Sequence, residues 1–503
     1  MSNGLALAVL SGMAVGQGSQ GDRGGSERLS ALDATFLDVE TRESPMGIGA
    51  VCIFDAGTML HSDGSFDVPR LRAHVDRAIA SLPRYRQRIV HTPVIGQPVW
   101  IDDTKFNLDF HLRYTRLPSP GDDRQLQRLA ARLFSQPIDR DHPLWELWCV
   151  EGLTEHRFAI IGKVHHCMAD GAAGVGLLTA LLRPTPTAIT PEPPPPWQPQ
   201  AAPQATALLR DEIAHRNHQT FGMVRTLARA MTQAVAGPAS MPPAHQRKAA
   251  GTRPAHAVAN GIYDILRAAL HRRTRTPLTP DRIGGARRFD IARVSLADVK
   301  AIAAQLGGTV NDVVLTLVAG VLREFLTQRG MNPTTIGALR AMIPVNLRAP
   351  GSEQGGNQLA MLLTELPIQE ADPRVRHRLV REATDRLKHQ SDQIAASAFV
   401  TSIADAAATG VLSKIFHAAV RLRSFDVVVT NVRGPSDALF VGDAPMLALY
   451  PMVPLYERQA IGVAVFGYAG TLHIGLSAAW DLVPDLHDVA LQFERCLDEL
   501  RSD

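Results

Sequence analysis

The hydrophobic pattern predicts strands and helices in both halves of the chain. Residues 158–164 form a continuous apolar run rich in β-favouring side chains, which is typical of a buried strand. Strand character also occurs at 46–54, 342–348, 427–435, 461–466 and 471–478. Apolar positions recur at helical spacing at 29–37, 66–82, 124–134, 172–182, 313–326 and 485–500. Because strands and helices are mixed in comparable amounts in the two halves, we expect an α/β protein.

Length and composition predict two domains. A chain of 503 residues exceeds the usual size of a single hydrophobic core. Its composition changes abruptly at 184–203, where four prolines in a row at 193–196 favour an extended polyproline linker. We therefore expect four parts: a disordered leader, an N-terminal domain, a Pro-rich linker with connecting helices, and a C-terminal domain. Their ranges are 1–25, 26–183, 184–280 and 281–503.

Charge and cysteine content exclude several classes of function. Lys and Arg number 52 against 49 Asp and Glu, a net charge of +3 that gives no support to a nucleic-acid partner. The four cysteines are scattered without a CxxC pair, so neither a zinc site nor a disulfide framework is indicated, and a reducing interior is expected. The longest apolar runs fall below the roughly 18 residues of a transmembrane helix. Any membrane contact is therefore expected to be peripheral.

The candidate chemistry is concentrated in an HHxxxDG motif at the end of the 158–164 strand. Histidine, with an unperturbed pKa of about 6.5, can take and return a proton near neutral pH, so one of His165 and His166 is a candidate general base. Gly171 permits a sharp turn, and Asp170 is expected to fix the loop by holding its backbone or an arginine. Cys167, inside the motif, is expected to be a buried filler. The alternative interpretation is a histidine pair on a surface loop.

The motif favours direct acyl transfer over a covalent intermediate. The chain has no GxSxG sequence, so it lacks the usual setting of a serine nucleophile. Attack by an acceptor that a histidine base activates is therefore preferred to an acyl-enzyme.

Two further segments are candidates for the site. Pro143, Leu144 and Trp145 form a fixed turn with a large apolar surface just before the next strand. This turn lines an acyl pocket or packs in the core, and both interpretations stay open. Asn311 and Asp312 lie at the start of the 313–326 helix, where they act as local caps or, for Asn311, orient a substrate.

The basic segments of the chain each allow both a structural and a ligand-binding interpretation. The turn at 83–88 holds three arginines, which are either solvated at a helix end or bind phosphate. Amphipathic helices with neighbouring arginines are predicted at 221–235 and 261–270, and such helices either pack against the protein or lie on a lipid surface.

Several motifs, in order, resemble those of the bacterial wax ester synthase/acyl-CoA:diacylglycerol acyltransferase family. They cover roughly residues 26–501, which makes the resemblance more specific than HHxxxDG alone, a motif shared with peptide-synthetase condensation domains. The matching segments are 29–37 with Pro45 and Met46, 143–145, 165–171, 311–312, 344–348, 431–435 and 483–485.

The resemblance implies a fold of two chloramphenicol-acetyltransferase-like α/β domains with a tunnel between them. Long-chain acyl-CoA, a substrate rather than a resident cofactor, would enter from one side, and diacylglycerol or a fatty alcohol from the other. His166 would deprotonate the acceptor hydroxyl and return the proton to the departing sulfur. His165 would support the loop, Asp170 would hold its shape and Gly171 would permit its turn.

The same resemblance assigns the remaining site residues. Pro143, Leu144 and Trp145 would shape the acyl pocket, and Asn311 and Asp312 would hold the site together. Three positions depart from the family pattern and bear on acceptor choice: Gly47 in place of histidine, Asn346 in place of serine and Thr279 in place of asparagine.

The expected function is a diacylglycerol O-acyltransferase that makes triacylglycerol without metal or cofactor. The alternatives are a wax ester synthase and a non-catalytic lipid-surface binding paralogue. Condensation on carrier-protein thioesters is disfavoured, because no carrier or adenylation region adjoins the chain. The family-level expectation for location is the cytoplasm, with peripheral attachment at the inner membrane face or lipid bodies.

Overall fold

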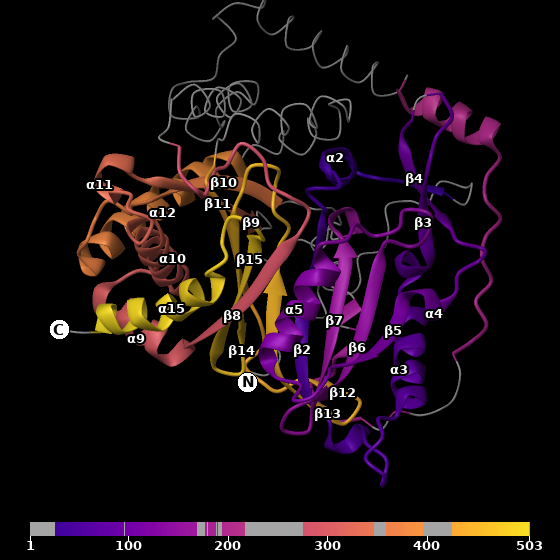
Figure 1. Ribbon diagram of the computed structural model, residues 1–503. Helices are drawn as coiled ribbons and strands as arrows, with labels where there is room; N and C mark the ends of the chain where they lie inside the picture. Colours follow the sequence, from indigo (N-terminus) through magenta and orange to yellow (C-terminus); the bar gives the residue numbers. More distant parts are fainter. Residues whose placement is uncertain are drawn as a thin grey trace, which may run out of the picture.

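The computed structural model describes residues 26–94, 96–168, 177–178, 180–187, 189, 194–216, 275–346, 359–395 and 425–501. The described elements form two α/β halves side by side, each built on a six-stranded sheet (Figure 1). The predicted leader at 1–25, most of the predicted 172–182 helix and the amphipathic helices at 221–235 and 261–270 lie outside the described residues.

The N-terminal sheet has the strand order β12-β13-β2-β7-β6-β5. In the centre, β7 (Arg157–His165) pairs antiparallel with both β2 (Gly47–Asp55) and β6 (Trp145–Leu153), and β5 (Leu112–Arg116) closes the edge parallel to β6. Alternate residues of β2 and β7 point to opposite faces. One face packs on α3 (Val68–Ala80), whose apolar stripe is buried, and the other packs on α5 (Asp123–Phe134).

Smaller elements complete this half. A three-stranded sheet orders β1 (Ser26–Arg28), β4 (Pro98–Asp102) and β3 (Gln87–His91). The helix α2 (Ala31–Val39) follows β1 and is capped by Ser30, whose side chain accepts the Asp33 N–H. Short turns of helix complete the half: η1 (Gly57–Met59), η2 (Pro83–Arg86), α4 (Leu108–His111) and η3 (His166–Met168).

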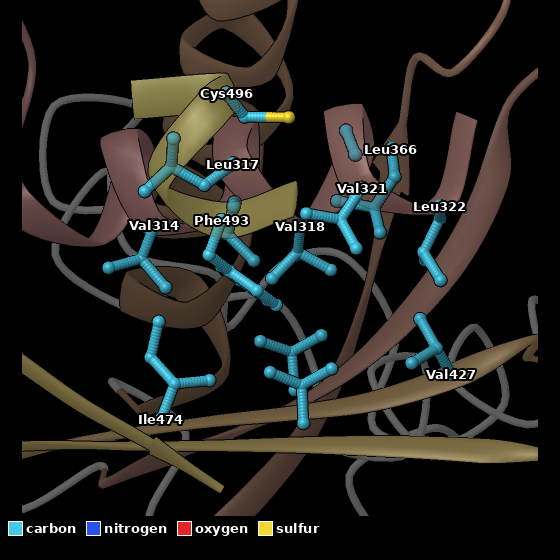
Figure 2. Close-up of a cluster of buried hydrophobic side chains, with 14 of the residues drawn as sticks. Val314, Leu317, Val318, Val321, Leu322, Leu366, Val427, Ile474, Phe493 and Cys496 are labelled. Atoms are coloured by element: carbon cyan, nitrogen blue, oxygen red, sulfur yellow. The ribbon is translucent and has the colours of Figure 1, made fainter. Parts of the chain in front are cut away.

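The C-terminal sheet has the order β10-β9-β11-β14-β15-β8. Its strands are β8 (Arg287–Ser295), β9 (Leu339–Asn346), β10 (Leu359–Leu366), β11 (Val427–Arg433), β14 (Ile461–Tyr468) and β15 (Thr471–Ala479). The helices of this half are α9 (Leu296–Leu306), α10 (Val310–Thr327), α11 (Pro333–Ile336), α12 (Pro373–Ala395) and α15 (Leu486–Arg501). Figure 2 shows the core in which Val314 and Val318 of α10 and Phe493 of α15 pack over Val427 and Ile474 of the sheet.

Two strands from the C-terminal part of the chain belong to the N-terminal sheet. β12 (Phe440–Val441) and β13 (Ala444–Met452) come from the segment expected to belong to the C-terminal domain, yet they complete the N-terminal sheet, where β13 pairs antiparallel with β2. The turn between them is anchored by Arg70 of α3, which binds both carboxylate oxygens of Asp443 at 2.9 and 3.0 Å. The expected 281–503 range therefore does not form a spatially separate unit.

Other sequence expectations agree with the structure. The predicted strand at 158–164 is β7, and the helices predicted at 66–82, 124–134, 313–326 and 485–500 are α3, α5, α10 and α15. Among the described residues, no single helix has the length and hydropathy of a membrane span. The pair α9 and α10, bent by 99° at their junction, passes that test together by length and composition only.

Candidate active site

Backbone hydrogen bonds fix the positions of the two histidines. β7 ends at His165, whose N–H donates to the Leu144 carbonyl at 2.9 Å. His166 begins η3, and its N–H donates to the Met46 carbonyl at 2.8 Å. The strand end is thus held on one side by the turn before β6 and on the other by the residue before β2.

The His165 ring is fully buried, and its contacts indicate which nitrogen carries the proton. Nδ1 accepts the Cys167 N–H at 3.1 Å. The proton is therefore assigned to Nε2, which lies 3.4 Å from Oε2 of Glu40. His165 is held between the η3 backbone and a carboxylate, and its supporting role in the reaction stays a prediction.

Glu40 connects His165 to three other segments. It caps the C-terminus of α2, and its Oε1 accepts the Met46 N–H at 2.8 Å. Its Oε2 accepts from Arg140 Nη2 at 2.7 Å and Nε at 3.1 Å, while the same Nη2 donates to the Leu37 carbonyl at 2.9 Å. Burial raises the pKa of Glu40, but His165, the Met46 N–H and Arg140 outweigh it and bring the pKa to about 2. Glu40 is therefore a carboxylate at neutral pH.

The His166 ring stacks on Phe36 of α2, with ring centroids 3.7 Å apart and planes inclined by 18°. The residue is partly exposed, whereas its Nδ1 is buried and has no hydrogen-bond partner among the described residues. Burial is the largest effect and lowers the pKa of His166 to about 4; its own backbone opposes this shift, and the neighbouring His165 adds a smaller lowering. At neutral pH this imidazole is uncharged and able to accept a proton.

Of the other motif residues, the structure describes Cys167 but not Asp170 or Gly171. Cys167 is buried, and burial raises the pKa of its thiol well above the usual range, which agrees with a packing role. Asp170 and Gly171 lie outside the described residues, so their assigned roles stay predictions. Among the described residues, no group of three or more His, Cys, Asp or Glu has the arrangement of a metal site.

Pro143, Leu144 and Trp145 form the turn that accepts the His165 N–H. Leu144 and Trp145 have no exposed surface and belong to the N-terminal core. The Trp145 indole donates to the Tyr85 carbonyl at 2.8 Å and stacks on His111 at 4.5 Å. The core-packing interpretation therefore holds for Leu144 and Trp145, and their part in an acyl pocket stays a prediction.

Asn311 and Asp312 occupy the first turn of α10. Asp312 forms a capping box with Thr309, accepting its N–H at 2.7 Å, and its other oxygen accepts the Thr384 hydroxyl of α12 at 2.7 Å. The local-cap interpretation is thus confirmed for Asp312. Asn311 Oδ1 accepts a hydrogen bond from Asn431 Nδ2 of β11 at 3.3 Å. This bond links the family-matching segments 311–312 and 431–435.

The N-terminal side of the site meets the C-terminal half through an apolar contact. Val39 and Met46 pack in one buried cluster with Met342, Phe425, Val428 and Tyr456. Segment 40–46, which provides Glu40 and Met46 to the histidines, therefore lies at the junction of the halves. The tunnel expected at this junction stays a prediction.

Position 47, where the family resemblance leads us to expect histidine, lies close to a buried lysine. Gly47 of β2 lies opposite His165 of β7, and a Cβ atom at position 47 would lie 3.0 Å from Cε of Lys163. Lys163 is buried there because its ammonium donates to the Leu133 carbonyl at the end of α5 at 2.9 Å. Glycine leaves room for this lysine.

Sequence reasoning missed Phe36, Glu40 and Arg140. One signal was available for the first two: Phe36 lies near the end of the predicted 29–37 helix, and Glu40 follows four residues later, which is one helical turn along. Arg140 lies just before the Pro-Leu-Trp turn and carries no such signal.

The chain matches the family model of the wax ester synthase/diacylglycerol acyltransferase catalytic domain over residues 29–314 and that of the WS/DGAT C-terminal domain over residues 355–501. The chain belongs to this family. A Mycobacterium tuberculosis protein named as a diacylglycerol O-acyltransferase is 31% identical, over 94% of this chain and 99% of its own length. Another from the same species is 29% identical over 98% and 94%. The protein is accordingly an acyltransferase that uses acyl-CoA and an acyl acceptor.

Solved structures confirm the fold of this WS/DGAT family member. The wax ester synthase/diacylglycerol acyltransferase from Marinobacter aquaeolei VT8 is 23% identical, with a TM-score of 0.64 over 94% of this chain and 98% of the other. A starter condensation domain of rhizomide synthetase RzmA, solved in complex with C8-CoA and Leu-SNAC, is 12% identical, with a TM-score of 0.55 over 95% of both chains. The expected two-domain, chloramphenicol-acetyltransferase-like α/β architecture is therefore correct.

Proposed function

We propose that this WS/DGAT protein transfers a long-chain fatty acyl group from acyl-CoA to diacylglycerol and so forms triacylglycerol, with His166 as the general base. The observation that carries the proposal is a neutral imidazole, partly exposed at a strand end and oriented by Phe36. The choice of diacylglycerol is supported by the names of full-length relatives.

The reaction requires one proton to move twice. Because Nδ1 of His166 is buried, we assign the reaction to Nε2, which takes the proton of the acceptor hydroxyl as its oxygen attacks the thioester carbonyl. The carbon–sulfur bond then breaks, and His166 returns the proton to the departing sulfur, which leaves coenzyme A as a thiol. Acyl-CoA is consumed as a substrate, and no resident cofactor takes part in this scheme.

The surrounding residues hold the base in position. Phe36 orients the His166 ring, while Glu40 and Arg140 hold His165 next to it. A positioned base contributes about 10²–10⁴-fold to the rate, and the alignment of two substrates in a water-poor site supplies much of the rest. In this proposal Asp170 and Gly171 shape the loop, and Asn311 helps to orient a substrate. Because both substrates are lipids, the enzyme works at a membrane or lipid-body surface.

A fatty alcohol is the second candidate acceptor, which would make the product a wax ester. The supporting observation is that the solved relative from Marinobacter aquaeolei is named for both activities.

The test is an acyl-transfer assay with purified protein, palmitoyl-CoA and either diacylglycerol or hexadecanol, measuring free thiol and neutral lipid product. We expect product with diacylglycerol and a loss of about hundredfold or more in His166→Ala. The matched control is His91→Ala, because His91 is an exposed histidine on β3 that makes no contact with the site. Its rate should equal that of the native protein.

Each other outcome has a defined meaning. A higher rate with hexadecanol would identify a wax ester synthase. Product formation that persists in His166→Ala would refute the assignment of His166 as the general base. Folded native protein that binds diacylglycerol vesicles but gives no product with either acceptor would contradict the enzyme proposal and favour a lipid-binding paralogue.

A further inference from the structure

Arg287 reaches from the C-terminal half into the N-terminal half. It is the first residue of β8, yet its guanidinium is buried, with Nη2 donating to the Glu43 carbonyl at 2.5 Å. Nη1 donates to the Gly284 carbonyl at 2.5 Å and to the Ala286 carbonyl at 3.2 Å. The backbone N–H of Arg287 donates to the Ser135 hydroxyl, just after α5, at 2.9 Å. Side chain and backbone thus both contact the N-terminal half.

The segment that Arg287 holds is the turn between Glu40 and Met46. Thr41 and Ser44 close this turn through two backbone hydrogen bonds of 3.3 and 3.1 Å. Gly285 approaches the same turn so closely that a Cβ atom there would lie 3.1 Å from the Arg42 carbonyl oxygen. The chain before β8 therefore packs backbone to backbone on the turn, and the guanidinium secures that contact.

Glu40 and Met46 flank this turn and make the contacts that fix the two histidines. Glu40 lies against His165, and the Met46 carbonyl accepts the His166 N–H. A movement of the turn would shift both contacts together. We propose that Arg287 is a positioning residue for acyl transfer, which holds turn 41–44 across the junction and thereby orients His165 and His166. This inference rests on the proposed role of His166.

A role only in joining the halves does not account for these contacts. Phe289, two residues further along β8, is buried in an apolar cluster with Val51, Phe134 and Tyr450, and this cluster joins the halves without Arg287. A buried guanidinium is unfavourable unless it is hydrogen-bonded, and here its planar fork binds carbonyl oxygens from two segments. Lysine, a single point donor on a flexible stem, cannot reproduce that arrangement.

The test compares three variants by kcat, by KM for palmitoyl-CoA and by melting temperature. Arg287→Met should lower kcat by about tenfold to hundredfold, because an ångström-scale misplacement of a catalytic group has effects of that size. Its KM should stay within about twofold, since Arg287 does not contact substrate in this proposal. Arg287→Lys keeps the positive charge and should have an intermediate kcat.

The matched control is Arg288→Met, the next residue along the chain. Arg288 stacks on the exposed Trp480 ring at 3.8 Å and donates to the Trp480 carbonyl, both within the C-terminal half. Its kcat should equal that of the native protein.

A second readout does not depend on the acceptor. The rate at which diethyl pyrocarbonate modifies His166 is followed by peptide mass spectrometry between pH 3.5 and 8, because only the neutral ring reacts. In Arg287→Met and Arg287→Lys the pH midpoint at His166 should move upward, as the ring loses its fixed place on Phe36. A native protein without transferase activity would refute the proposed function, yet this midpoint would still show whether Arg287 holds the His166 ring in place.

Three results would overturn the inference. The first is an unchanged kcat and midpoint in folded Arg287→Met. The second is an equal loss of kcat in Arg288→Met. The third is an unfolded Arg287→Met together with native kcat and midpoint in Arg287→Lys, which would limit Arg287 to a role in folding.

Discussion

The buried Glu40 carboxylate lies 3.4 Å from Nε2 of the buried His165 ring. Glu40 ends the same helix whose Phe36 stacks on His166. One short helix therefore orients both histidines of the HHxxxDG motif through two side chains a single turn apart.

Replacing Glu40 by glutamine should reduce acyl transfer without changing the shape of the side chain. Gln lacks the charge that pairs with His165 and Arg140, and a hydrogen bond to a charged group contributes about 1.5–3 kcal/mol. We expect kcat to fall by about tenfold or more. The control is Glu146→Gln on β6, which removes a carboxylate lying 4.0 Å from Arg113. Equal rates for Glu40→Gln and the native protein would refute this role.

The stability that Glu40 provides should depend on pH. Its pKa is lowered from 4.5 to about 2 in the folded state, which corresponds to about 3 kcal/mol of stabilisation. Because the folded pKa is the lower one, this stabilisation is fully present above pH 4.5 and is lost as the pH falls toward 2. Urea unfolding of the native protein and Glu40→Gln should differ most at pH 5–7 and converge below 4.5. A difference that grows on acidification would contradict the assignment.

The acid limb of the rate profile should lie unusually low for a histidine base. The pKa of His166 is about 4, so the ring stays neutral from pH 7 down to about 5, and kcat/KM should fall only as the pH approaches 4. Phe36→Leu opens the ring to water and should move this limb upward toward 6.5. The control is Phe66→Leu, since Phe66 is a buried phenylalanine that packs on Phe158. A native limb near 6.5 would contradict the assignment of His166, with its lowered pKa, as the base.

Asp312→Asn should affect stability more than catalysis. The Asp312 carboxylate accepts from Thr309 and Thr384 and is buried, so an amide in its place would put donors against donors. We expect the free energy of unfolding to drop by about 1–3 kcal/mol, with kcat of the folded variant within a few-fold of native. Asp298→Asn, at the equivalent position of α9 but partly exposed, should change stability by less than about 0.5 kcal/mol. A hundredfold loss of kcat in folded Asp312→Asn would indicate a direct role in the reaction.

Trp145→Phe should destabilise the N-terminal half without altering acyl-chain preference. The substitution leaves the buried Tyr85 carbonyl without its indole donor, which costs about 1–3 kcal/mol. The control is Trp148→Phe, because the Trp148 indole bonds to Glu146, a partly exposed side chain. Competition between C12 and C18 acyl-CoA measures the preference. A changed preference in Trp145→Phe alone would establish the acyl-pocket role that the family resemblance implies.

Elements with strong periodicity were predictable because each buries one face along its whole length. The run at 158–164 became β7, and the helical stripes at 66–82 and 313–326 became α3 and α10. In the structure Ser30 caps α2 and Thr309 caps α10. The position of His165 and His166 at the end of a strand was equally predictable, because they directly follow the apolar run in the sequence.

The partners of the site were not predictable in the same way. Arg140 binds Glu40 across 100 positions of the chain, and Arg287 reaches the Glu43 carbonyl from the other half. The pairing of β13 with β2 of the N-terminal sheet could not be predicted from the local sequence either, because an antiparallel sheet edge accepts any strand of suitable pattern.

The sequence by itself determined the α/β character, the main elements, the HHxxxDG chemistry and the family, because local periodicity and motif spacing are properties of short stretches. Only the tertiary structure decided that Phe36 and Glu40 face the histidines, that Leu144 and Trp145 are core residues, and that Arg287 closes on turn 41–44. The physical reason is that hydrogen bonds and ring stacking act over a few ångströms. Which distant residues come within that range depends on how whole faces of helices and sheets pack together.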